Sequence, residues 1–225
     1  MFRFVVLLLL ALPLVAGAEE FVPGITIDKE KKSVAIQAKM APRKLPHLEK
    51  EYPIEVIACW PHDRANGKGQ KAHETVVTID VLPSDVHKAL EAVGLKPGSP
   101  VKGGEKPCTG PDLNVSLEWK GDGGASKKLS IDKLLIDPKT RLPFPKSVKF
   151  RFTGSAMTKL DPNKEETRYG ADLTGTLIAI YPVTDETVCQ TSLTMKEEKY
   201  LKLDTNAAVL PKQDTPVLLI LEAAK

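Results

Sequence analysis

The sequence has few aromatic residues, three cysteines and little excess charge. Phe, Trp and Tyr make up 5% of the 225 residues, which argues against a stacking platform for single-stranded nucleic acid. The formal net charge is +3 at pH 7, which excludes a strongly basic nucleic-acid surface and an acidic solvating tail. No apolar stretch beyond the N-terminal segment is long enough to span a bilayer. We therefore expect no nucleic-acid partner and no membrane span in the mature chain.

The composition that remains is that of a folded protein. Hydrophobic residues account for 42% of the chain and charged residues for 27%, so the chain can bury a substantial core. Its length fits one large domain or two small ones.

The first 18 residues have the pattern of a signal peptide. Arg3 supplies a positive start, residues 4–12 form a short apolar run, and residues 16–18 are small. We expect cleavage after Ala18 and export to the periplasm or the extracellular space. A retained membrane anchor is the alternative, whereas a lipid anchor is not supported because residue 19 is not cysteine.

Export to an oxidising compartment allows two of the three cysteines to pair. Cys59 lies in an apolar run typical of a buried strand, where a thiol behaves as a small hydrophobic group. Cys108 and Cys189 lie beside turn-forming residues, so they form the disulfide that we predict. The wide spacing of the three thiols argues against an iron–sulfur cluster held by this chain alone.

Short strands dominate the predicted secondary structure, together with one well-defined short helix. Residues 84–93 place Val86, Ala89, Leu90 and Val93 on one helical face, with Ser84 as the expected N-cap and Gly94 as the expected terminator. The predicted strands are 25–27, 33–38, 54–60, 74–81, 113–119, 128–136, 147–153, 171–181, 188–194 and 217–221. A hairpin loop is expected at 121–124. This pattern predicts a sheet-rich α+β fold or a β-sandwich with mostly antiparallel strands, and not a doubly wound fold.

A loop divides the mature chain into two parts. Residues 97–112 contain four glycines and four prolines, which is too broken for regular structure. We expect an N-terminal half at 19–96 and a β-rich C-terminal half at 113–225, which are either subdomains or parts of one domain.

The strand before the helix, the helix itself and the turn after it resemble the YdjY-domain family of exported bacterial proteins. The similarity is carried by residues 73–77, 83–90 and 94–98, with the strand 54–59 before them. Residues 152–155 and 176–180 are also similar to longer members. The resemblance implies an exported or envelope-associated protein and implies no reaction. Some members occur beside four-iron cluster domains, but this chain lacks the tandem cysteines that would bind such clusters.

Four residues in the family-like segment are of types that bind zinc or copper: Cys59, His62, His73 and His87. Their spacing matches no recognised zinc motif. His87 falls in the first helical turn, where a positive charge is disfavoured, so we expect a neutral imidazole.

The residues offer little support for an enzyme. Ser155 follows a glycine but lacks the Gly-x-Ser-x-Gly pattern of a nucleophile elbow, which makes a hydrolase a distant alternative. We therefore expect an exported, non-enzymatic binding or scaffolding protein that recognises an envelope protein or another ligand and needs no cofactor. The alternative is a metal-associated or redox-associated accessory protein that uses the His and Cys residues of the family-like segment.

Overall fold

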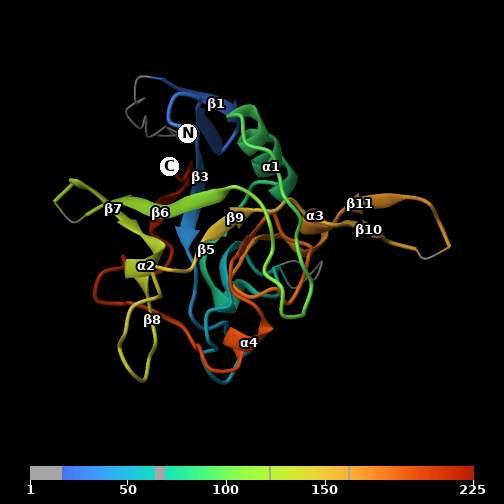
Figure 1. The fold of residues 1–225 in the computed structure, drawn as a ribbon. Helices are drawn as coiled ribbons and strands as arrows, with labels where there is room; N and C mark the ends of the chain where they lie inside the picture. The colour runs from blue at the N-terminus through green and yellow to red at the C-terminus, as the bar shows by residue number, and fades with distance from the viewer. Residues whose placement is uncertain (1–16, 64–68, 122, 162) are drawn as a thin grey trace, which may run out of the picture.

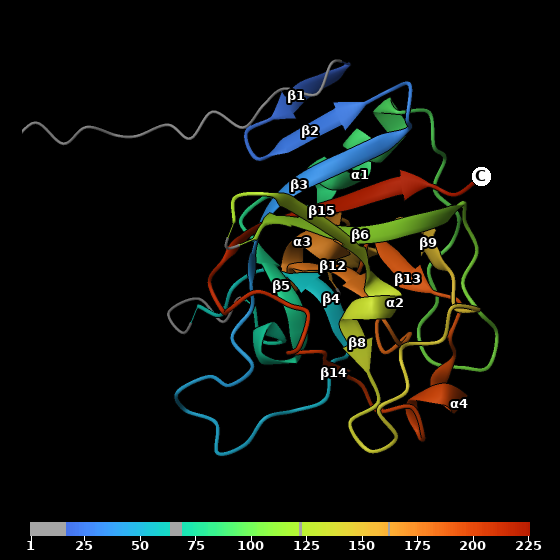
Figure 2. The same cartoon turned by 90° about the vertical axis from the view of Figure 1, so that its left-hand side faces the viewer.

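A closed β-barrel forms the body of the protein in the computed structural model, which describes residues 17–63, 69–121, 123–161 and 163–225. Eight strands close the barrel, each paired with the next and the last with the first (Figure 2). In order around the barrel these are β3 (Ser33–Met40), β15 (Pro216–Ala223), β6 (Asp112–Lys120), β9 (Phe150–Phe152), β13 (Cys189–Thr191), β12 (Thr176–Ala179), β4 (Val56–Cys59) and β5 (Thr75–Ile79). Strands from residues 19–96 and from residues 113–225 thus contribute to the same barrel.

Two barrel strands change partner along their length. The N-terminal half of β3 pairs with β2 (Ile25–Asp28), which in turn pairs with β1 (Ala18–Val22), whereas its C-terminal end pairs with β5. Likewise, β6 starts beside β9 and then pairs with β7 (Ser126–Ser130). The sheet therefore extends beyond the barrel at both strands.

The barrel is mixed, which refines the expectation of mostly antiparallel strands. The pairs β4–β5 and β12–β13 are parallel, while the other strand pairs are antiparallel. The sheet-rich α+β class is confirmed. Parallel pairing has no local sequence signature, because it joins strands through a longer connection rather than through a tight turn.

Alternating side chains give the barrel its core. Along β3, Val34, Ile36, Ala38 and Met40 are buried, while the residues between them are partly or fully exposed. This is the period of two that places alternate side chains on one face of a strand. They join a single large cluster that also contains the fully buried Leu117, Phe152, Ile178 and Leu219.

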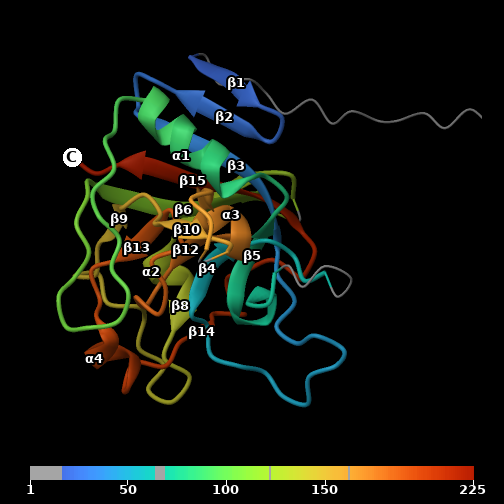
Figure 3. The same ribbon diagram turned by 90° about the vertical axis from the view of Figure 1, so that its right-hand side faces the viewer.

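The predicted helix is confirmed as α1 (Pro83–Ala92), which contacts β2 and β3 through its apolar face (Figure 3). Gly94 follows it with a φ of 88°, and its N–H donates to the Glu91 carbonyl at 2.8 Å. The expected capping by Ser84 is wrong. Leu82 occupies the N-cap position, and Pro83 begins the helix, so Ser84 lies inside the first turn. No N-cap side chain binds the first amides, and the Ser84 N–H donates to Asp172 Oδ1 at 2.8 Å.

Three further short helices interrupt segments that were expected to be extended or irregular. The remaining elements are η1 (Ala72–Glu74), α2 (Ile131–Leu134), β8 (Leu135–Ile136), β10 (Met157–Lys159), β11 (Thr167–Tyr169), α3 (Gly170–Thr174), α4 (Met195–Glu198) and β14 (Asp204–Thr205). Helix α2 splits the predicted strand 128–136, and α3 replaces the start of the predicted strand 171–181. Gly175 ends α3 with a φ of 72°, which a continuous strand does not allow.

The loop regions agree with the sequence predictions where they are described. Residues 97–112 contain only an isolated bridge between Ser99 and Thr109 before β6 begins. The hairpin at 121–124 joins β6 and β7 as expected, although Asp122 lies outside the described residues. Most of the predicted signal peptide, residues 1–16, also lies outside them. In the described part of the chain, no helix has the length and apolar character needed to cross a membrane.

Candidate functional site

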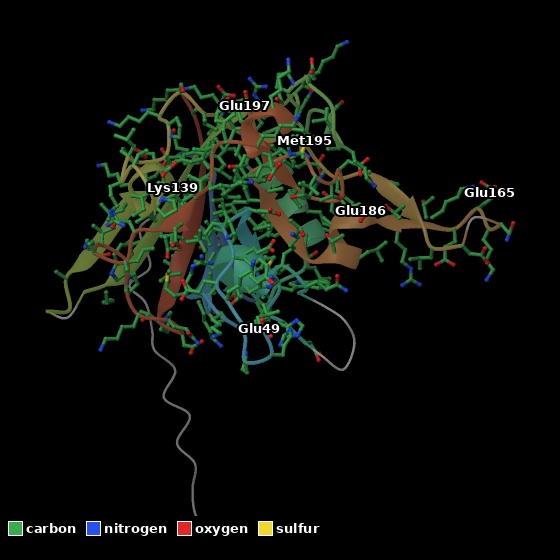
Figure 4. The ribbon with its side chains drawn as sticks, turned by 90° about the horizontal axis from the view of Figure 1, so that it is seen from below. Glu49, Lys139, Glu165, Glu186, Met195 and Glu197 are labelled. Atoms are coloured by element: carbon green, nitrogen blue, oxygen red, sulfur yellow. The ribbon has the colours of Figure 1, made fainter. Side chains whose placement is uncertain are left out.

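One hairpin stands away from the barrel. We call residues 157–169, which comprise β10, β11 and their connection, the arm. Its strands pair with each other in the register Met157 to Tyr169, and within the described residues they pair with no other strand. Figure 1 shows the arm projecting from the body, and Figure 4 places Glu165 near its far end. A two-stranded hairpin is marginally stable alone, so its contacts with the body matter.

The base of the arm is held by hydrogen bonds from both strands. The Tyr169 hydroxyl lies 2.7 Å from His87 Nδ1. On the other strand, Thr158 Oγ1 donates to Glu186 Oε1 at 2.7 Å. The Gly170 N–H donates to the Ala156 carbonyl at 2.9 Å, which closes the hairpin at its root. These contacts fix the direction in which the arm leaves the body.

We call His87, Phe152, Gly154 and Ser155 the socket, because they receive the base of the arm. The His87 ring meets the Phe152 ring edge-on, with centroids 5.0 Å apart, and the Tyr169 ring at 5.4 Å. Gly154 has a φ of 68°, and a Cβ there would lie 3.3 Å from His87 Cε1. Ser155 Oγ accepts a hydrogen bond from the Ala171 N–H at 2.9 Å. Glycine at 154 therefore gives the imidazole its space.

Burial determines the protonation states of His87 in the socket and of Tyr169 at the base of the arm. Desolvation lowers the pKa of His87, although Glu91 Oε2, 3.5 Å from Nε2, opposes this effect. Burial also raises the pKa of Tyr169, so its hydroxyl is protonated. The Glu91 carboxylate can only accept a hydrogen bond, so the neutral imidazole carries its hydrogen on Nε2, facing Glu91. Nδ1 then accepts from the Tyr169 hydroxyl. The neutral His87 thus serves to position the arm.

The socket brings together two segments that carry the family resemblance, the helix 83–90 and residues 152–155. A family model described as the YdjY domain matches residues 25–222. The chain belongs to the YdjY-domain family. The match covers both halves of the chain, so the similarity extends well beyond the short segments that carry it in the sequence and includes residues from all eight barrel strands. No curated protein and no solved structure matches the chain.

The four predicted metal ligands of this YdjY domain lie in different surroundings. Cys59 Sγ donates to the Trp60 carbonyl at 3.3 Å, and burial raises the pKa of the thiol to about 12. His73 Nε2 lies 3.2 Å from Glu74 Oε1, and His87 binds Tyr169. His62 stacks on a histidine that the sequence analysis did not single out, His47, with ring centroids 5.0 Å apart.

These positions bear on the metal hypothesis without deciding it. Within the described ranges, no three His, Cys, Asp or Glu residues are grouped so that they could hold a metal ion. Metal binding by Cys59, His62, His73 and His87 stays a prediction. The spacing of His47 and His62 along the chain matches no metal motif, so only the fold reveals that they are neighbours.

The predicted disulfide partners lie in segments that touch. All three cysteines are buried and carry no disulfide in the structure. Cys108 Sγ donates to the Thr191 carbonyl at 3.2 Å, and Thr191 follows Cys189 by two residues in β13. The loop 97–112 therefore packs against the strand that contains Cys189. The Cys108–Cys189 pairing stays a prediction.

Proposed function

We propose that this YdjY domain is an exported, non-enzymatic binding protein that recognises an envelope protein through the arm. The observation that supports this most directly is the projection of the arm, with one edge of each strand unpaired by any described strand. An unpaired edge offers N–H and C=O groups to an incoming strand, which is a common mode of peptide recognition.

Exposed apolar side chains give the arm a second means of recognition. Met157 is 57% exposed and Leu160 is 54% exposed, although both are large apolar residues. Apolar anchors add affinity to the main-chain hydrogen bonds of strand addition. The charged residues of the arm largely pair with one another, as in Lys159 with Glu165 and Arg168 with Glu166. We therefore expect the apolar residues and the strand edges to determine binding.

The rigid base favours this role over that of a loose surface loop. Because Tyr169 and Thr158 are anchored on opposite strands, the base of the arm does not have to be ordered when a partner binds. Preorganisation of this kind lowers the entropic cost of association. The socket supplies the anchoring, and the barrel supplies the rigid support.

Export is the second part of the proposal, and it rests on the signal-peptide pattern of residues 1–18. Strand β1 begins at Ala18, and Glu19 forms an ion pair with Lys29 at 2.7 Å. Cleavage after Ala18 would leave nearly all of β1 in the mature protein. N-terminal sequencing of the protein recovered from the envelope should give Glu19 as the first residue, and a chain that retains Met1 in the cytoplasm would contradict export.

Partner capture tests the arm directly. A photo-crosslinking residue replaces Met157 or Leu160 in the full chain, expressed in its own host, and the crosslinked products are identified by mass spectrometry. The matched control is Leu142, which is 64% exposed and lies in the same turn as Lys139, where the Asp137 N–H donates to the Leu142 carbonyl. Figure 4 places Lys139 on the side of the body away from the arm. We expect a specific protein adduct from the arm positions and none of the same mass from position 142. Identical adducts from all three positions, or none from the arm, would argue against the proposal.

Charge substitutions provide the complementary test. Leu160→Glu should abolish the adduct formed from position 157, while Leu142→Glu should leave it unchanged. Because both side chains are exposed, neither substitution should alter the unfolding temperature by more than about 2 °C. If the Leu160→Glu protein still formed the adduct, the apolar side chains of the arm would not contribute to binding.

A further inference from the structure

The ring of His62 is the most unusual polar group of the barrel periphery. Both ring nitrogens are buried, and neither has a hydrogen-bond partner among the described residues. A neutral imidazole carries a hydrogen on one nitrogen and a lone pair on the other. Burying both without partners costs free energy, and such groups in folded proteins commonly mark the position of a water molecule or an ion.

His62 lies beside a second imidazole and a pocket. The His47 ring stacks on it with an interplanar angle of 28°. Both histidines line a pocket of about 510 Å³, together with Lys39, Asp80 and Asp214. The pocket is formed by the chain segments around β3, β5 and the turn before β15, on a part of the barrel different from the socket.

The charges and donor types of this pocket favour a cation. Its lining carries two carboxylates and one ammonium group, so an anionic ligand would meet net repulsion. Imidazole nitrogens favour zinc, copper and nickel, whereas magnesium and calcium favour sites composed only of oxygen ligands. We propose that the pocket binds a divalent first-row transition-metal ion, with His62 as the principal ligand and His47 as the second.

The expected site is open and exchangeable. Because no three of the described His, Cys, Asp or Glu residues could hold an ion together, water would complete the coordination, with Asp80 or Asp214 neutralising part of the charge. Structural zinc sites use four protein ligands, so a site with two imidazoles should bind more weakly and release its ion readily. This site differs from the ligand set predicted from sequence, because His87 is engaged by Tyr169 and His73 Nε2 by Glu74. His73 Nδ1 is also buried without a hydrogen-bond partner among the described residues, but His73 does not line this pocket.

The test uses the mature chain, purified without a histidine tag. The chain has four histidines, so their ring proton signals can be assigned by NMR. Substoichiometric Cu²⁺ should broaden the signals of His62 and His47 first, and Mg²⁺ should have no effect. Calorimetric titration with Cu²⁺, Ni²⁺ and Zn²⁺ should show binding that weakens about ten-fold or more in His62→Gln and is unchanged in His73→Gln.

Each other outcome overturns the proposal. Broadening that begins at His73 or His87 would assign the metal to the residues predicted from sequence. Affinity that is unchanged in both His62→Gln and His47→Ala, or equal in the urea-unfolded chain, would identify adventitious binding. His47 is exposed, so His47→Ala should fold even if a substitution of His62 does not, and the NMR experiment requires no variant.

Discussion

Replacing Tyr169 with phenylalanine should loosen the arm while leaving the barrel closed. The substitution removes only the hydroxyl that lies 2.7 Å from His87 Nδ1. The lost hydrogen bond and the partly buried nitrogen left without a partner should together cost about 1–3 kcal/mol. The aromatic contacts of residue 169 with His87 remain, because phenylalanine keeps the ring.

Native-state hydrogen exchange followed by NMR measures where this cost falls. If the hydroxyl positions the arm, amides of β10 and β11 should exchange about 5- to 150-fold faster, which is the factor that corresponds to 1–3 kcal/mol. Strand β15 is paired with β3 on one side and β6 on the other, so its amides should change far less. The control is Tyr200→Phe, because Tyr200 is 69% exposed and its hydroxyl lies at 3.5 Å from Glu197. Unchanged exchange in the arm, or an equal increase in β10, β11 and β15, would refute a positioning role for the contact.

Three more predictions concern pH, backbone geometry and the thiols. Burial lowers the pKa of His87 in the folded chain, so the unfolded chain takes up its proton first as pH falls below about 6.5. The free energy of unfolding, measured in urea, should therefore fall from pH 6.5 downwards and fall less in His87→Gln; equal pH slopes in the two proteins would contradict this. Gly175→Ala should destabilise by about 2–4 kcal/mol, because its φ is 72° and the new Cβ would lie 2.6 Å from the Trp60 ring. Gly103→Ala, with a φ of 65° and no atom within 4 Å, should lose only about 1 kcal/mol in the same urea titration, and similar losses would show that the Trp60 contact is unimportant. If Cys108 and Cys189 pair after export, alkylation of the denatured, unreduced protein should label Cys59 alone, and three labelled cysteines would exclude the bridge.

The sequence predicted elements whose determinants are local. Helix α1 follows from the spacing of Val86, Ala89 and Leu90 and from the positive φ that Gly94 adopts. The hairpin between β6 and β7 follows from its glycine-rich loop. Helix α2 could not be predicted in the same way, because a single turn at Ile131–Leu134 is too short to distinguish the 3.6-residue period of a helix from the two-residue period of a strand.

The closure of the barrel and the candidate sites depend on contacts between distant segments. Nothing near Tyr169 in the sequence identifies His87 as its partner, and nothing near His62 identifies His47. The neutral state expected for His87 agrees with the lowered pKa, but its cause is burial against Phe152 and Tyr169 rather than the helix dipole alone. In the sequence His87 stands out only as a residue type that binds metals, whereas its role in holding the arm follows only from the three-dimensional arrangement.

The position of β15 has a consequence for biogenesis. This strand follows all the other barrel strands in the sequence, yet it lies between β3 and β6 and pairs with both along most of its length. A ribosome-bound chain that lacks residues 216–223 leaves two long edges open and cannot complete the barrel. Closure of the barrel therefore waits for the strand that follows all the others in the sequence, and the segments that carry β3 and β6 cannot be joined before it is available.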